Sequence, residues 1–223
     1  MSFHSRRNFL KSSAGLAAAA GGTAAPSTAV SSLRVIGAND RIRIGLIGCG
    51  GMGRGDLRDF LRTGEVECVA LCDVDKSQID KTQQTVVERA GQKAEFLTQD
   101  FRRVIDRNDI DAVIVATPDH WHAIPTVMAC KSGKDVYVEK PLALTIPEGR
   151  VMVDVASREG RVVQVGTQQR SAEHYTDAVE YVRSGKLGQI RLVRTWVYLD
   201  WKAETPARPD ADAPNGVDYD MWL

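Results

Sequence analysis

The sequence predicts an α/β fold: a doubly wound parallel sheet, followed by the start of an α+β domain with an antiparallel-type sheet. Three observations support this prediction. A glycine-rich turn joins a short apolar strand to an apolar-periodic helix, an acidic residue ends the next strand, and further apolar strands alternate with single helices. Single helices between strands require right-handed crossovers, which cover both faces of one sheet.

The first predicted strand, over residues 42–47, runs directly into a G-x-G-x-x-G turn and then a helix. In this spacing Gly48 makes the tight turn, Gly50 lets a pyrophosphate approach the backbone, and Gly53 lets the helix pack close to the strand. The start of that helix attracts phosphate through its N–H groups and dipole. We therefore predict a Rossmann dinucleotide site at Gly48, Gly50, Gly51, Met52 and Gly53. The alternative is a set of glycine-rich connections in an unliganded sheet.

The second predicted strand, over residues 66–73, ends in Asp73. This residue lies about 20 positions after Gly53, where the fingerprint places a ribose-binding carboxylate. Such a carboxylate accepts hydrogen bonds from the ribose 2′-hydroxyl and repels a 2′-phosphate. Because no arginine directly follows Asp73, we predict NAD as the cofactor in preference to NADP.

The alternation of helix and strand then continues to about residue 166. In order, we expect a helix over 76–90, a strand over 95–97, a helix over 101–106, a strand over 112–116, a helix around 124–128, a strand over 135–139, a helix over 146–159 and a strand over 162–166. The strand over 112–116 is almost continuously apolar, as expected when helices cover both faces of a parallel sheet. We place the nucleotide-binding domain at residues 41–167.

The pattern changes in residues 168–223. A helix is predicted over 171–184, and a longer strand with alternating sides over 188–198, which is typical of an antiparallel sheet. A strand with no sheet partner after it cannot close a core. We therefore expect residues 168–223 to begin an incomplete substrate and oligomerisation domain, and the chain to be the front part of a longer protein.

The first 40 residues are of a different kind. Residues 5–11 read S-R-R-N-F-L-K, which matches the twin-arginine export signal, and an alanine-rich stretch follows over 14–25. We predict a signal peptide over residues 1–30, a linker over 31–40, export to the periplasm or another extracytoplasmic compartment, and no membrane insertion after cleavage. The alternative is a disordered basic tail with an alanine run.

Composition excludes several other classes. The 223 residues contain 29 Lys and Arg against 29 Asp and Glu, so no net charge favours nucleic acid. Cys68 and Cys72 lie roughly 13 Å apart along one predicted strand, too far for a disulfide. The pair His120 and His122 lacks a third ligand at a convincing spacing, so we predict no metal.

Two polar groups follow neighbouring strands at the edge where ligands bind. One is T-P-D-H-W-H over Thr117–His122, and the other is Glu139-Lys140-Pro141. Taken alone, the first is typical of helix capping and packing, and the second of a solvated turn. Their shared position at the carboxyl ends of the strands favours a binding role for both.

These segments resemble the Gfo/Idh/MocA family, whose members include glucose–fructose oxidoreductase and inositol dehydrogenase. The resemblance covers about residue 41 to the chain end, and the E-K-P after the fifth strand is its most specific mark. Residues 166–170 match the family segment that leads into the second domain. The resemblance implies a nicotinamide-dependent oxidoreductase that acts on a sugar, cyclitol or related polyol, with tightly bound cofactor and a homo-oligomeric full-length protein.

The resemblance also implies roles for individual residues. Lys140 would be the catalytic residue, which polarises or orients the substrate oxygen while hydride passes between carbon and cofactor. Glu139 would pair with Lys140 or contact the nicotinamide ribose. Thr117 and His122 would line the nicotinamide side, and Gln168 the mouth shared with the substrate.

One departure from the family leaves other functions open. The family's second domain supplies an Asp and a His as an acid/base pair, and nothing in this chain matches it, since His174 precedes that domain's first strand. One alternative is an NAD-dependent glycoside hydrolase, which acts by transient sugar oxidation and elimination. A further alternative is a non-catalytic protein that binds nucleotide or sugar.

Overall fold

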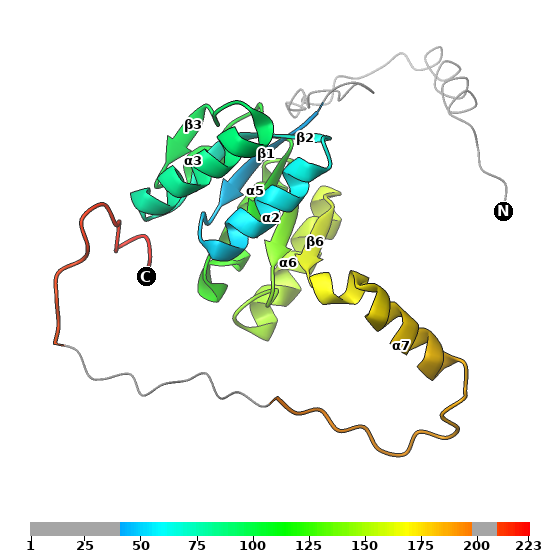
Figure 1. Cartoon of the computed structure of the whole chain (residues 1–223). Coiled ribbons are helices and arrows are strands. Elements are labelled where there is room, and N and C mark those ends of the chain that lie inside the picture. The colour runs from blue at the N-terminus through cyan, green and yellow to red at the C-terminus, as the bar shows by residue number, and fades with distance from the viewer. Residues whose placement is uncertain (1–40, 198–208) are drawn as a thin grey trace, which may run out of the picture. The chain divides into compact units, whose positions relative to one another are not determined.

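The computed structural model describes residues 41–197 and 209–223, so the predicted signal peptide and linker lie outside the described residues. Six parallel strands form one sheet in the order β3-β2-β1-β4-β5-β6 (Figure 1). The strands are β1 (Ile42–Ile47), β2 (Val66–Cys72), β3 (Phe96–Thr98), β4 (Ala112–Val115), β5 (Asp135–Glu139) and β6 (Val163–Gly166). The strand order reverses between β1 and β4, which is where doubly wound folds bind ligands.

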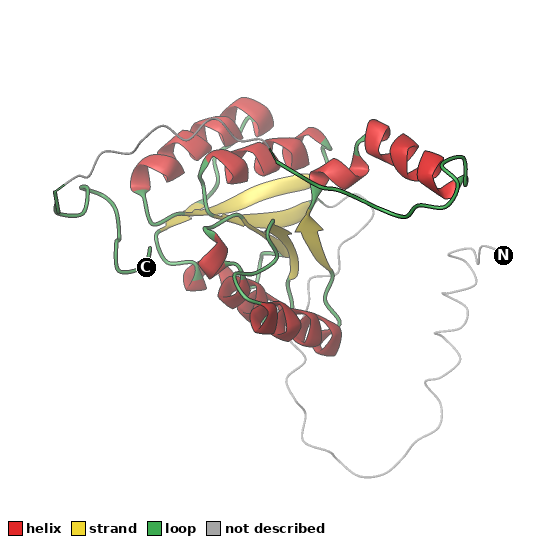
Figure 2. Ribbon diagram, turned by 90° about the horizontal axis from the view of Figure 1, so that it is seen from below, coloured by secondary structure: helices red, strands yellow, loops and turns green. Residues whose placement is uncertain are grey.

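Helices cover both faces of this sheet, as Figure 2 shows. The helices that pack on the sheet are α2 (Gly51–Arg62), α3 (Lys76–Ala90), α4 (Arg102–Ile105), α5 (Ala123–Lys131) and α6 (Ile146–Glu159). The helix α7 (Glu173–Arg183) has no buried residue and extends away from the sheet, and two short 3₁₀ helices are η1 (Asp119–Trp121) and η2 (Gln168–Ser171). Leu57 of α2 and Val86 of α3 are buried against one face. Val104 of α4 and Met152 of α6 are buried against the other. The doubly wound fold predicted from the sequence is thus confirmed.

Local signals set the ends of the helices. Asp75 caps α3 by accepting the backbone N–H of Ser77, and Gly91 ends that helix with φ of 72°. Thr145 and Glu148 form a reciprocal capping box at the start of α6. These ends place the loops that follow β2 and β5 at the carboxyl edge of the sheet.

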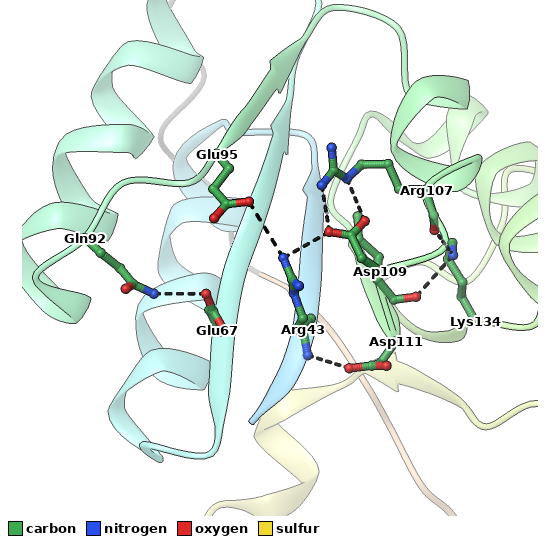
Figure 3. Close-up of polar contacts among 9 residues, drawn as sticks. Arg43, Glu67, Gln92, Glu95, Arg107, Asp109, Asp111 and Lys134 are labelled. Carbon is green, nitrogen blue, oxygen red and sulfur yellow. Dashed lines mark hydrogen bonds and ion pairs between the residues drawn. The ribbon is translucent and has the colours of Figure 1, made fainter. Parts of the chain in front are cut away.

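A charged network ties together the opposite, amino-terminal edge of the sheet (Figure 3). Arg43 on β1 forms an ion pair with Asp109 at 2.9 Å, and its backbone N–H donates to Asp111. Lys134, which is buried just before β5, donates to the backbone carbonyl oxygens of Arg107 and Ile110 at 2.6 and 3.1 Å. Burial lowers the pKa of Lys134. The network joins the starts of three strands, far from the predicted ligand edge.

The prediction of a strand over 188–198 needs correction over residues 188–197, the part of it that the structure describes. Residues 188–197 form no helix or strand, and their large apolar side chains are exposed, as at Trp196. A strand needs a neighbour for its backbone N–H and carbonyl groups. Within the described residues this segment has none, so the predicted antiparallel-type sheet is not observed, whereas the predicted helix over 171–184 is present as α7.

Two further findings concern the described part of the chain. Its four cysteines, Cys49, Cys68, Cys72 and Cys130, are buried free thiols. Among its helices, none is both long and apolar enough to cross a membrane.

Candidate cofactor site

The glycine turn between β1 and α2 has two kinds of glycine. Gly48 adopts φ of +96°, and a Cβ there would overlap the backbone of Ala116, which directly follows the neighbouring strand β4. A Cβ at Gly53 would overlap the carbonyl oxygen of Gly48. At Gly50 and Gly51, by contrast, a Cβ would meet nothing within 4 Å. The fold therefore requires Gly48 and Gly53, while Gly50 and Gly51 leave open space at the start of α2.

Asp73, which follows β2, contacts this turn directly. One carboxylate oxygen accepts the backbone N–H of Cys49 at 2.7 Å, and the other accepts that of Asp75 at 2.9 Å. Burial raises the pKa of Asp73 above its ordinary value. The residue predicted to bind the ribose thus also holds the glycine turn in place.

A groove of about 700 Å³ runs along the carboxyl edge of the sheet. Of the predicted site residues, it is lined by Gly48, Gly50, Gly51, Met52, Asp73, Thr117, Glu139 and Lys140. These residues follow β1, β2, β4 and β5, so the parallel topology gathers four separate segments around one groove. The hydroxyl of Thr117 is buried and has no hydrogen-bond partner within the described chain.

His122, in contrast, lies behind the groove. The residue is 1% exposed, and its ring nitrogens contact the carbonyl oxygens of Pro141 at 2.5 Å and Thr117 at 2.9 Å. The predicted contact of His122 with the nicotinamide side is therefore replaced by a positioning role. It fixes the two turns that carry Thr117 and Lys140.

Glu139 and Lys140 sit where β5 enters the groove. Glu139 is buried, and its side chain accepts the backbone N–H of Lys140 at 3.1 Å. The Lys140 side chain is exposed at the groove. Glu139 thus orients the backbone from which Lys140 projects.

Glu139 and Gln168, both predicted site residues, form a polar cluster with Asp56 and Tyr137, which sequence reasoning missed. Gln168 in η2 donates its side-chain amide to Glu139 at 2.5 Å, to Tyr137 at 3.1 Å and to Asp56 at 3.4 Å. Burial, and next the charge of Glu139, raise the pKa of Asp56 to about 6. Gln168 therefore acts through Glu139 in this structure, and it links β5 to the first turn of the segment after β6.

These features fit a dinucleotide. The first turn of α2 carries no acidic side chain, its N–H groups face the open space beside Gly50, and Asp73 lies one strand away. Helix N-termini of this kind bind phosphate, and a carboxylate at the end of the second strand binds ribose. Among the described residues, no group of three or more His, Cys, Asp or Glu side chains is placed to hold a metal ion.

Comparisons with known proteins agree with this geometry. Among curated proteins, the chain is 32% identical over 201 residues to a glycosyl hydrolase family 109 protein of Shewanella pealeana, covering 83% of this chain and 44% of the relative. It is 30% identical over 152 residues to an alpha-N-acetylgalactosaminidase of Shewanella oneidensis, covering 67% and 33%. The chain therefore spans less than half the length of these relatives.

Solved structures with the same fold include two inositol dehydrogenases. One is a myo-inositol 2-dehydrogenase from Lactobacillus plantarum, with a TM-score of 0.60 and 27% identity over 68% of this chain and 43% of that chain. The other is a scyllo-inositol dehydrogenase from Lactobacillus casei with bound NAD(H) and scyllo-inositol, with a TM-score of 0.59 and 25% identity over 67% and 43%.

The family match covers the whole of the sheet. Residues 42–167 match the sequence profile of the oxidoreductase family described as having an NAD-binding Rossmann fold. The six strands, the glycine turn and Asp73 all fall within these residues. The chain therefore belongs to the Gfo/Idh/MocA oxidoreductase family, whose profile is that of an NAD-binding Rossmann fold.

Proposed function

We propose that the full-length protein is an NAD-dependent oxidoreductase that transfers hydride to or from a sugar, cyclitol or related polyol and keeps its cofactor tightly bound. The observation that carries this proposal is the placement of Lys140. It follows buried Glu139 at the end of β5 and lines the same groove as the glycine turn and Asp73. One groove thus contains a cofactor cradle and an exposed cation.

In this proposal, different residues of the chain bind the cofactor and act on the substrate. Bound NAD would supply the hydride acceptor or donor. Gly50 and the start of α2 would hold its pyrophosphate, and Asp73 its adenosine ribose. The Lys140 ammonium would stabilise negative charge on the substrate oxygen as its proton is lost. Glu139 fixes the Lys140 backbone, so the cation is positioned before substrate arrives.

The curated relatives favour a second candidate, an NAD-dependent glycoside hydrolase. In that reaction the sugar is oxidised transiently, the glycosidic bond is eliminated, and the sugar is reduced again. Both reactions need a cofactor groove and a cation beside the sugar oxygen, so the groove alone is compatible with either. Assays with polyol substrates and with glycoside substrates distinguish the two reactions.

The experiment uses the full-length protein. Absorbance at 340 nm is followed after addition of inositols, sugars and uronates, and p-nitrophenol release is followed from glycosides, including the α-N-acetylgalactosaminide. Net NADH formation with a polyol supports the dehydrogenase. Glycoside cleavage without net NADH supports the hydrolase. Saturable ligand binding without either reaction, unchanged in Lys140→Ala, would favour a non-catalytic binder.

We also propose that residues 1–30 direct export by the twin-arginine pathway, because residues 5–11 carry its motif. Replacement of Arg6 and Arg7 by Lys should leave the protein in the cytoplasmic fraction with an uncleaved N-terminus. A periplasmic yield of this variant equal to that of wild type would contradict the assignment.

A homo-oligomer of the full-length protein is proposed on the family resemblance, and light scattering of the purified protein tests it.

A further inference from the structure

The segment Pro214–Trp222, which has no assigned role, lines the cofactor groove. Five of its residues, Pro214, Val217, Tyr219, Met221 and Trp222, share the groove with the glycine turn and Asp73. This contact is not explained by the fold of residues 42–167, because the segment lies outside the part that matches the family profile.

The first anchor of this segment is the loop that follows Asp73. Asp218 donates its backbone N–H to the carbonyl oxygen of Val74 at 2.8 Å, and Lys76 donates to that of Gly216 at 3.1 Å. Val217 forms an antiparallel bridge with Asp75 between these two hydrogen bonds. The segment is therefore bound through its backbone to the three residues next to the ribose-binding carboxylate.

The second anchor lies at the end of β4. The carbonyl oxygen of Trp222 accepts the indole N–H of Trp121 at 3.2 Å and lies 2.9 Å from Nε2 of His120. In the sheet, β2 and β4 flank β1, and β1 carries the glycine turn. The segment thus crosses from one side of the glycine turn to the other.

The segment carries two aromatic side chains, Tyr219 and Trp222. The rings of Tyr219 and Trp222 stack with centroids 5.9 Å apart and an interplanar angle of 6°. Trp222 also meets His120 edge to face, with centroids 6.0 Å apart. A flat, mostly apolar wall of this kind is suited to a purine base, whose faces stack on aromatic rings.

We propose that residues 214–222 form the outer wall of the adenosine half of the NAD groove and slow the release of the cofactor. The location follows from the first anchor, since Asp73 marks the adenosine ribose while Lys140 marks the opposite, nicotinamide end. The inference rests on the cofactor site of the proposed function, but it concerns binding alone and does not depend on which reaction follows.

The test measures how fast full-length protein loaded with NADH releases it when excess NAD is added. We expect Trp222→Ala to release NADH at least tenfold faster, and Trp222→Phe, which keeps a ring, to stay near the wild-type rate. Ile146→Ala removes an apolar side chain that is 91% exposed and does not line the groove, so it should leave the rate unchanged. Tyr219→Ala provides a second variant should Trp222→Ala fail to fold.

Reduced nicotinamide mononucleotide, which lacks the adenosine half, identifies the end of the groove that is affected. The affinity for this shortened ligand should be the same in wild type and Trp222→Ala. An equal loss for both ligands, or an unchanged NADH release rate in folded Trp222→Ala and Tyr219→Ala, would overturn the proposal. Failure of wild type to bind NADH would overturn it together with the cofactor assignment, whereas absence of turnover with normal binding would affect only the proposed reaction.

Discussion

Asp73 holds Cys49 through a hydrogen bond of 2.7 Å between its carboxylate and the backbone N–H at the centre of the glycine turn. The residue predicted to bind the cofactor ribose therefore also shapes the turn predicted to receive the pyrophosphate. In a parallel sheet these two positions come from neighbouring strands, β1 and β2, and their contact follows from the strand order. The predicted ribose contact and the geometry of the glycine turn thus depend on the same side chain.

The first prediction concerns Asp73→Asn. The amide keeps one acceptor oxygen for two N–H groups, so we expect a loss of about 1–3 kcal/mol in the free energy of unfolding. The affinity for NAD should fall about tenfold, as for one lost hydrogen bond to a charged group. The preference for NAD over NADP should shrink, because the charge that repels a 2′-phosphate is gone. Titration of both cofactors measures this, and an unchanged preference would contradict the role of Asp73.

The second prediction distinguishes the structural role of Gly53 from the cofactor-binding role of Gly50. Gly53→Ala should destabilise the fold, since its Cβ would overlap the carbonyl oxygen of Gly48. Gly50→Ala should keep the melting temperature near that of wild type, because its Cβ meets nothing within 4 Å, but it should weaken NAD binding by filling the space left for the pyrophosphate. Thermal unfolding and cofactor titration test both variants. Normal NAD binding by Gly50→Ala would place the pyrophosphate elsewhere.

The third prediction concerns Lys140→Ala in the full-length protein. Loss of the ammonium should lower turnover about 10²–10⁴-fold, the usual range for a group that assists proton transfer. The content of bound NAD(H) should be unchanged, because the variant keeps the glycine turn and Asp73, which are predicted to hold the pyrophosphate and the ribose. Lys131→Ala, at an exposed position on α5, is the matched control. Turnover of Lys140→Ala within twofold of wild type would contradict the catalytic assignment.

The fourth prediction is a pH dependence of stability. The pKa of Asp56 is raised from 3.8 to about 6 in the folded state. Between these two values the folded state binds more protons than the unfolded chain, so stability falls as pH rises through about 6. Asp56→Asn removes the buried charge, and it should have a higher melting temperature than wild type at pH 8 and a smaller advantage at pH 5. Asp59→Asn, an exposed acid on the same helix, should show no such trend.

The fifth prediction concerns the edge of the sheet away from the groove. Lys134→Met leaves the carbonyl oxygens of Arg107 and Ile110 without their buried donor. We expect a loss of about 2–5 kcal/mol in the free energy of unfolding, measured by urea titration, with NAD affinity unchanged in the folded protein. Arg150→Ala, in an exposed ion pair with Asp154, should leave the free energy of unfolding nearly unchanged. A specific loss of NAD affinity in Lys134→Met would show that the two edges are coupled.

Much of the fold was predictable because its signals are local. The apolar runs that form β1, β4 and β5, and the glycine stop at Gly91, depend on neighbouring residues only. The glycine turn and Asp73 were predictable because their spacing alone indicates the ligand. The strand expected over 188–198 depended on a sheet partner, and local alternation could not supply one.

The parts that sequence could not predict depend on contacts between distant residues. Asp56 is an acid on an amphipathic helix, and nothing nearby indicates that Gln168, 112 residues later, covers it. The wall formed by residues 214–222 likewise depends on backbone hydrogen bonds to the loop after Asp73, which leave no pattern in either segment. Histidine is a residue type that often binds ligands, so the sequence alone favoured that role for His122. Only its two contacts with backbone carbonyl oxygens reveal its positioning role.

The most direct test of the account is the nucleotide content of the full-length protein, purified from an export-competent host. The protein is denatured, and released NAD(H) and NADP(H) are separated by chromatography and quantified by absorbance. We predict close to one NAD(H) per chain, little NADP(H), and a clear loss of NAD(H) in Gly50→Ala. A wild-type protein that carries no nucleotide and shows no saturable binding when titrated with NAD would contradict the assignment of the groove.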